Sequence, residues 1–98
     1  MQQKYPPAKV IAIDVDGTLI TKGVVNDDLV AWCIDRKNEG FCMILWSARG
    51  EKHAKNAAKI TNLEGVFNHI LSKPSYIVDD KGWSWIKYTR VIKSFVNF

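Results

Sequence analysis

Apolar residues fall into short runs that predict the strands of a sheet. Residues 9–15 (KVIAIDV) and 41–46 (FCMILW) are almost continuously apolar and have the length of buried strands. Residues 66–71 (VFNHIL) predict a third strand, and residues 76–78 (YIV), after Pro74, predict a short fourth. Because Val and Ile fill the first run almost without interruption, we expect the sheet to be covered on both faces.

Two segments between these runs have the signals of helices. Asn26 can cap a helix whose first turn contains Asp27 and Asp28, and Gly40 can end it. Residues 51–62 (EKHAKNAAKITN) predict a second helix. One face of that helix consists of small residues that permit close packing on a sheet, namely Ala54, Ala57, Ala58 and Thr61.

The last part of the chain, residues 81–98, fits two patterns. Its spaced apolar residues match a helical stripe better than a strand, so we favour a helix. The segment contains three lysines, one arginine and no acid, which accounts for the net charge of +4. Trp83, Trp85 and Tyr88 among these cations could stack on bases or sugars. We favour the alternative, in which the aromatic rings cover the sheet and the cations face water, because a small core needs them.

The order of strands and helices predicts a parallel α/β sheet in one domain spanning residues 1–98, with residues 1–8 as a leader. No apolar run approaches the roughly 18 residues of a membrane span, and the leader lacks the apolar core of a secretion signal. We therefore expect a cytoplasmic protein with no membrane partner. Cys33 and Cys42 lie in apolar surroundings without metal-ligand spacing and are expected to be reduced core thiols.

Acidic residues follow the ends of two predicted strands. Parallel sheets bind ligands beyond the carboxyl ends of their strands, where Asp14 and Asp79 fall. Asp14 and Asp16 are two residues apart, so in an extended chain their side chains point the same way, and Gly17 permits a turn directly afterwards. Together with Asp79 and Asp80, these carboxylates would suit a hard cation, for which magnesium is the best candidate.

Two further residues near the predicted strand ends have the chemistry for binding a phosphoryl group. Ser47 supplies a hydroxyl after the second strand, and Lys73 supplies a positive charge ahead of the fourth. Acids with magnesium, a hydroxyl and a lysine form a set suited to phosphoryl transfer. Taken singly, Ser47 could be a helix N-cap and Lys73 a solvated lysine.

Four short motifs resemble those of the haloacid dehalogenase (HAD) superfamily, in the same order. They are DVDGTL at residues 14–19, Ser47 after MILW, Lys73 before Pro74, and IVDD at residues 77–80. The phrases ILWSARG and SKPSYIVDD look more particularly like small capless members associated with capsular polysaccharide biosynthesis. The resemblance implies a minimal Rossmann-like parallel sheet sandwiched by helices. Neither spacing between motifs has room for a cap domain, so the site should be open.

The resemblance also implies a role for each motif residue. Asp14 would be the nucleophile and Asp16 the general acid and base, with Lys73 offsetting charge on the nucleophile. Ser47 and Lys73 would hold the phosphoryl oxygens, while Thr18 would support the loop by hydrogen bonding. Magnesium would bind the residues Asp14, Asp16, Asp79 and Asp80, the last through water or as an orienting partner.

These roles describe a magnesium-dependent phosphomonoester hydrolase acting on a phosphorylated small molecule such as a sugar phosphate. The alternatives are a phosphatase for nucleic-acid ends, which the basic tail would favour, and a phosphate-binding or regulatory module without turnover. An open site could also be closed by a second copy of the chain. Arg49 could reach an anionic substrate but is interpreted as a surface residue. His53 and His69 have no metal-ligand spacing and are interpreted as a surface and a strand residue.

Overall fold

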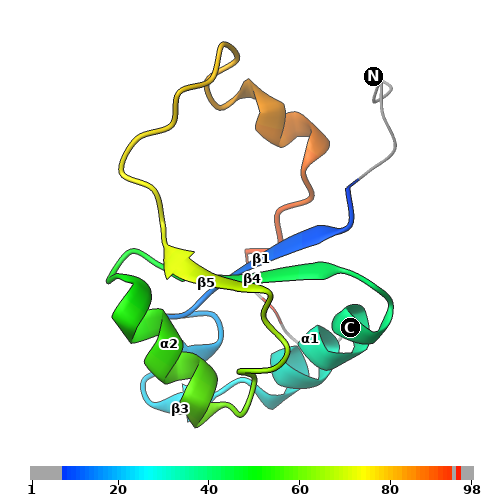
Figure 1. Cartoon of the computed structure of the whole chain (residues 1–98), viewed down its shortest axis with the longest axis vertical. Helices are drawn as coiled ribbons and strands as arrows, with labels where there is room; N and C mark the ends of the chain where they lie inside the picture. The colour runs from blue at the N-terminus through cyan, green and yellow to red at the C-terminus, as the bar shows by residue number, and fades with distance from the viewer. Residues whose placement is uncertain (1–7, 94, 96–98) are drawn as a thin grey trace.

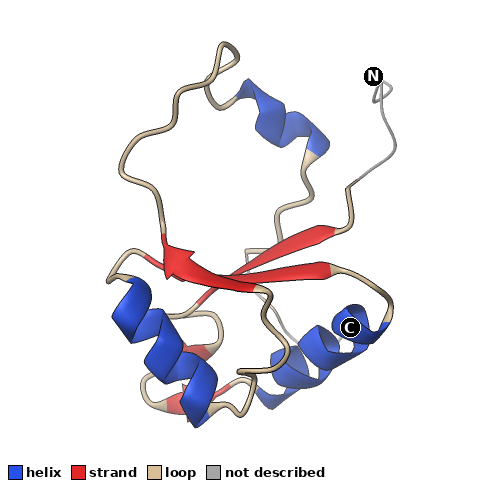
Figure 2. Ribbon diagram, in the orientation of Figure 1, coloured by secondary structure: helices blue, strands red, loops and turns tan. Residues whose placement is uncertain are grey.

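The computed structural model describes residues 8–93 and 95, which form a small α/β fold (Figures 1 and 2). Three parallel strands lie in the order β1-β4-β5, and two short strands, β2 and β3, form an antiparallel hairpin. The elements in chain order are β1 (Val10–Asp14), β2 (Ile20–Thr21), β3 (Val24–Val25), α1 (Asp27–Asn38), β4 (Cys42–Ser47), α2 (Glu51–Ile60), β5 (His69–Ser72) and the 3₁₀ helix η1 (Ser84–Tyr88).

Both α-helices cover the same face of the three-stranded sheet (Figure 2). Crossovers between parallel strands are right-handed as a rule. Because the chain moves from β1 to β4 to β5 in one direction, both helices then fall on one side of the sheet. Burial alternates accordingly along β4, where Met43 and Leu45 are buried and Ile44 is only half-buried. The expectation of a sheet sandwiched by helices is therefore wrong for the described residues, although the parallel sheet itself is confirmed.

The core lies between this face and the two helices. Leu45, at the centre of the sheet, is fully buried and pairs in register with Ile13 on one side and Ile70 on the other. The predicted small-residue face of α2 is confirmed, since Ala54, Ala57 and Ala58 are all buried. Short alanine side chains let this helix approach β4 and β5 closely, and so fix the start of α2 relative to the strand ends.

The predicted cap and end of α1 are confirmed. Asn26 Oδ1 accepts a hydrogen bond of 3.1 Å from the backbone N–H of Leu29, as an N-cap does. At the other end, the chain leaves the helix through Gly40, whose φ of +93° is a conformation that a residue with a Cβ rarely adopts. The cap and the glycine therefore set where α1 begins and where the chain turns back towards β4.

The predicted fourth strand, residues 76–78, is absent from the structure, which has irregular backbone there. Only Lys73, Pro74 and Ser75 separate this apolar run from the end of β5. A parallel neighbour of β5 needs a crossover of a dozen or more residues, so this link is too short to make one. The chain instead leaves the sheet, and the side chain of Val78 is fully exposed.

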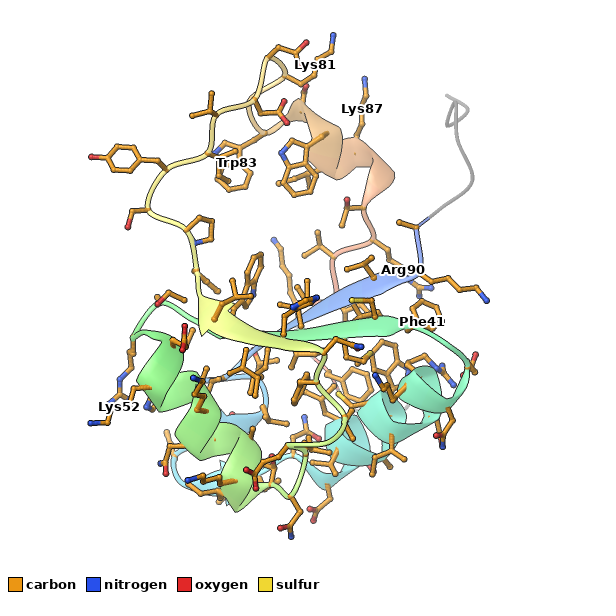
Figure 3. The ribbon with its side chains drawn as sticks, in the orientation of Figure 1. Phe41, Lys52, Lys81, Trp83, Lys87 and Arg90 are labelled. Atoms are coloured by element: carbon orange, nitrogen blue, oxygen red, sulfur yellow. The ribbon has the colours of Figure 1, made fainter. Side chains whose placement is uncertain are left out.

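The predicted helix over the tail is also wrong, because helical structure in the described part of the tail is limited to η1. Trp83 and Trp85 do not cover the sheet, since they are 66% and 38% exposed. Their rings instead lie 6.0 Å apart, centroid to centroid. Trp83 lies on the segment that arches away from the sheet (Figure 3). The chain returns at Phe95, whose ring meets Trp32 of α1 edge-on at 5.4 Å.

The links between strands are short. Between β1 and α1 the chain forms only the β2–β3 hairpin, and between β4 and β5 it forms only α2 and loops. The described residues therefore contain no cap domain. None of their helices is long and apolar enough to cross a membrane.

The buried cysteine fits the predicted core role. Cys33 of α1 is fully buried, and this burial raises the pKa of its thiol to about 12. A thiol with so high a pKa stays protonated near neutral pH and is a poor nucleophile. Cys42 is half-buried, and both thiols are free.

Candidate functional site

The candidate site lies at the carboxyl ends of the three parallel strands. Asp14 is the last residue of β1, Ser47 is the last residue of β4, and Lys73 directly follows β5. The backbone N–H of Lys73 donates a 3.0 Å hydrogen bond to the carbonyl of Ser47, which continues the β4–β5 pairing by one residue. The strand order thus brings residues far apart in sequence to one edge of the sheet.

Asp14 is held by two partners. Lys73 Nζ lies 3.2 Å from Asp14 Oδ1, and Thr18 Oγ1 donates a 3.2 Å hydrogen bond to Asp14 Oδ2. Asp14 and Lys73 side chains are 32% and 40% exposed, so the pair is screened by water only in part. In strand alternation Asp14 shares a face with Ala12, the face that the helices leave open. The carboxylate is therefore both fixed in position and accessible.

Asp16 faces different partners, because the chain turns immediately after β1. The turn is closed by the backbone N–H of Gly17, which donates 3.0 Å to the carbonyl of Ile20, and Gly17 has a φ of +78°. The extended backbone that we expected through Asp16 ends at Asp14, so the two-residue periodicity no longer applies there. The two acids consequently have separate environments.

The side chain of Asp16 lies beside the start of α2. His53 Nε2 is 3.2 Å from Asp16 Oδ1 and 3.1 Å from Oδ2, and Arg49 Nη1 is 3.4 Å from Oδ1. Arg49 and His53 are four residues apart across the beginning of α2, a spacing that puts both side chains on one side of the turn. Two side chains with ring or guanidinium nitrogens therefore lie against the carboxylate of Asp16.

Ser47 is placed at the same sheet edge but is deeply buried, with 1% exposure. Its alternation puts it on the helix-covered face with Met43 and Leu45. Its Oγ accepts a 3.0 Å hydrogen bond from the backbone N–H of Arg49, while Gly50 occupies the N-cap position of α2. The hydroxyl of Ser47 therefore orders the turn that presents Arg49, and its proton remains available for donation.

Asp79 and Asp80 are not gathered with Asp14 and Asp16. They precede Lys81 on the loop beyond β5, and Lys81 lies at the far side of this loop from the sheet (Figure 3). Asp79 Oδ1 accepts a 2.8 Å hydrogen bond from the backbone N–H of Lys81. In the structure as described, Asp79 thus stabilises its own turn.

Asp14 and Asp16 supply oxygens of the kind that magnesium prefers. The carboxylate of Asp14 and the backbone carbonyl of Asp16 stand on one turn and fit a hard cation by their chemistry. Across residues 8–93 and 95, however, no group of three or more His, Cys, Asp or Glu side chains is arranged to hold a metal ion. The described donor set is therefore incomplete without a third acidic ligand.

The sequence interpretation missed Arg49 and His53. Arg49 is a surface residue, as expected, and His53 is half-buried, but the contact of both side chains with Asp16 is not predicted from the sequence. Their four-residue spacing at the start of a helix that follows a strand end was the available signal. Without knowing which loop faces that helix, this spacing could not be linked to Asp16.

The site contains two carboxylates that have different neighbouring side chains. Asp14 has a cation and a hydroxyl as neighbours, which orient the carboxylate for attack on an electrophile. Asp16 has an imidazole and a guanidinium as neighbours, which hold the orientation of its carboxylate. The two carboxylates are therefore held by different sets of side chains.

Comparison with known proteins gives a family but no activity. A family model described as "Protein of unknown function (DUF705)" matches residues 1–95. No curated protein and no solved structure matches the chain. The chemistry of the site is therefore inferred from its own residues and motifs.

Proposed function

The chain belongs to the DUF705 family, and we propose that it is a phosphomonoester hydrolase that acts through an aspartyl-phosphate on Asp14. The observation that carries this proposal is the pairing of Asp14 with Lys73 Nζ at 3.2 Å at the carboxyl end of the sheet. A cation beside the attacking carboxylate can also hold the phosphoryl oxygens of the substrate. The resemblance of the four motifs to the HAD superfamily supports the same proposal, and we propose that the fold is of that type.

Hydrolysis of the phosphomonoester would proceed in two steps. An oxygen of Asp14 forms a bond to phosphorus while the bond from phosphorus to the leaving oxygen breaks. The leaving oxygen keeps the electron pair and takes the proton of Asp16. A water molecule then gives a proton back to Asp16 and attacks the same phosphorus, which releases inorganic phosphate and the free carboxylate of Asp14.

The other motif residues would support these steps. Lys73 would neutralise charge on the transferring phosphoryl group, and the Thr18 hydrogen bond would keep Asp14 in one orientation. Ser47 would act through the turn that it orders, by accepting the hydrogen bond from the backbone N–H of Arg49.

We also propose that the hydrolase needs magnesium, held by the Asp14 carboxylate and the Asp16 backbone carbonyl. The third ligand would be Asp79, with Asp80 bound through water, if the loop that follows β5 turned back towards the strand ends. When bound, the ion would supply positive charge to the phosphoryl oxygens. Magnesium chloride should then raise the melting temperature of the folded protein, because it binds the native state alone.

A panel of phosphorylated compounds tests the proposal directly. We expect phosphate release from a sugar phosphate or another small phosphomonoester in magnesium, and none when EDTA replaces magnesium. Release that is equally fast in EDTA would contradict the metal requirement. A folded protein that binds inorganic phosphate but releases none from any compound would favour the non-catalytic binding module instead.

One observation favours a second function, a phosphatase for nucleic-acid ends. Trp83 and Trp85 are exposed, in a segment with Lys81, Lys87 and Arg90 (Figure 3). A hollow of about 400 Å³ there is lined by Lys81, Ser84, Trp85 and Lys87. Exposed aromatic rings among cations are typical of surfaces that bind single-stranded nucleic acid by stacking and phosphate contacts.

Binding of a single-stranded oligonucleotide decides between the two substrate classes. If the nucleic-acid function holds, fluorescence anisotropy should show binding that weakens steeply with salt, and Trp83→Ala should weaken it about tenfold. Lys55→Ala on α2 is the matched control, because Lys55 pairs with Glu51 at 2.7 Å on another element. Absence of binding at low salt would exclude this second function and leave small phosphomonoesters.

A further inference from the structure

We infer that His53 is a positioning residue that holds the carboxyl group of Asp16 in its working orientation. This inference rests on the proposed function, because it concerns the group that would move the proton in both steps. It adds a residue that lies outside the four motifs, on the first turn of α2.

His53 contacts both oxygens of Asp16 almost equally. Nε2 lies 3.2 Å from Oδ1 and 3.1 Å from Oδ2, so it faces the carboxyl group end-on. The side chain of His53 is 27% exposed, whereas that of Asp16 is 49% exposed. His53 is thus the more buried partner, and Asp16 contacts it from the solvent side.

The helix that presents His53 is anchored by buried residues. The next residue, Ala54, is fully buried, and α2 packs through Ala57 and Ala58 against the sheet. Its N-cap residue, Gly50, has a φ of +109°, which sets the direction in which the helix starts. A side chain with two rotatable bonds on such a helix can fix its partner at small entropic cost.

Arg49 also contacts the carboxylate of Asp16, but more weakly. Its guanidinium lies 3.4 Å from Oδ1 through Nη1 alone, and its side chain is 66% exposed. Exposed single-contact ion pairs contribute little, and an arginine loses much side-chain freedom in making one. The shorter and less exposed contact of His53 is therefore the one that decides the orientation of Asp16.

The hydrogen bond would help Asp16 without consuming it. An Nε2–H group donates to one carboxyl oxygen, and the other oxygen remains to carry the proton towards the leaving oxygen of the substrate. A carboxyl group that rotates freely would spend most of its time misaligned for that transfer. Loss of the contact should accordingly slow proton transfer more than substrate binding.

The leaving group of the substrate gives the sharpest test. Protonation matters greatly for an alkyl phosphate, whose leaving alkoxide is strongly basic, and little for 4-nitrophenyl phosphate, whose leaving group is stable as an anion. We expect His53→Ala to lower kcat/KM about tenfold on an alkyl phosphate, a fraction of what general acid catalysis supplies. On 4-nitrophenyl phosphate we expect a change of less than about twofold.

Two variants control for indirect effects. Lys52→Ala changes the adjacent residue, whose side chain is exposed and points outward from α2 (Figure 3), and should leave both rates unchanged. His53→Gln keeps an N–H donor at a similar distance from the backbone and should restore most of the rate on the alkyl phosphate. Equal loss on both substrates in His53→Ala, without rescue by glutamine, would overturn the positioning role.

A second measurement separates failure of this inference from failure of the proposed function. Nitrogen-15 NMR of the imidazole should show a proton on Nε2 of His53, and Asp16→Asn should shift that resonance. An Nε2 that carries no proton, or that does not respond to Asp16→Asn, would overturn the inference whatever the activity. If every phosphomonoester stays intact while the NMR result is as expected, the proposed function fails and the contact stands as structural.

Discussion

Replacing Asp14 by asparagine should abolish phosphate release, with kcat lowered by at least about 10⁴-fold. The amide of asparagine has nearly the shape of the carboxylate but cannot attack phosphorus to form an acyl phosphate. The half-exposed pair with Lys73 contributes modestly to stability, so the free energy of unfolding should fall by less than about 1 kcal/mol. Steady-state phosphate release and urea denaturation measure the two quantities.

Asp35→Asn is the matched control for this change. Asp35 is an exposed aspartate on α1, and the same substitution there should alter neither kcat nor the unfolding midpoint beyond experimental error. Retention of turnover in Asp14→Asn would show that another group attacks phosphorus. If Asp14→Asn loses both turnover and the folded state, Lys73→Met tests the site instead. That variant should keep the fold and lower kcat about a hundredfold.

Leu45→Ala should produce the largest loss of stability, about 3 kcal/mol in the free energy of unfolding. Leu45 is fully buried in the central strand and lies between Ile13 and Ile70 in register. Truncation removes buried methyl groups and leaves a cavity that the surrounding strands cannot fill. For a domain of this size the total stability is itself a few times that amount, so thermal and urea unfolding will both register the change clearly.

Ile44→Ala tests whether burial really is one-sided. Ile44 is the neighbour of Leu45 along β4, but its side chain lies on the face without helices and is half-buried. We expect its truncation to cost about 1 kcal/mol, because less apolar surface returns to water and no cavity forms. Equal losses for the two variants would contradict the one-sided arrangement and imply that this face is also covered in solution.

Much of the fold could be predicted because its signals are local. The Asn26 cap, the glycine after α1 and the alanine face of α2 each act within a few residues, and each was identified correctly. The run at 76–78 has equally strong strand propensity, yet a strand needs a partner at a sheet edge. Pairing depends on the length and direction of links elsewhere in the chain, which a local pattern does not contain.

Some residues of the candidate site could likewise be predicted from the sequence, and others could not. The order of the four motifs predicted that Asp14, Lys73 and Thr18 belong to one site, and the structure brings these three side chains into contact at the carboxyl end of the sheet. Arg49 and His53 could not be assigned, because their partner depends on how a turn beyond β1 faces the start of α2. Contacts between two loops are set by packing, whereas contacts at strand ends are set by topology.

The pairing of the sheet has a consequence for how quickly the protein can fold. Strands that pair in the three-stranded sheet are separated in sequence by at least one helix: Val10 pairs with Cys42, and Ile44 pairs with His69. Each pairing therefore closes a long loop that contains a helix, and the entropy of closure is lost before the contacts are gained. The β2–β3 hairpin can form early but has two residues a strand. Asp14 and Lys73 meet only when both long loops have closed, so the site forms in the last stages of folding.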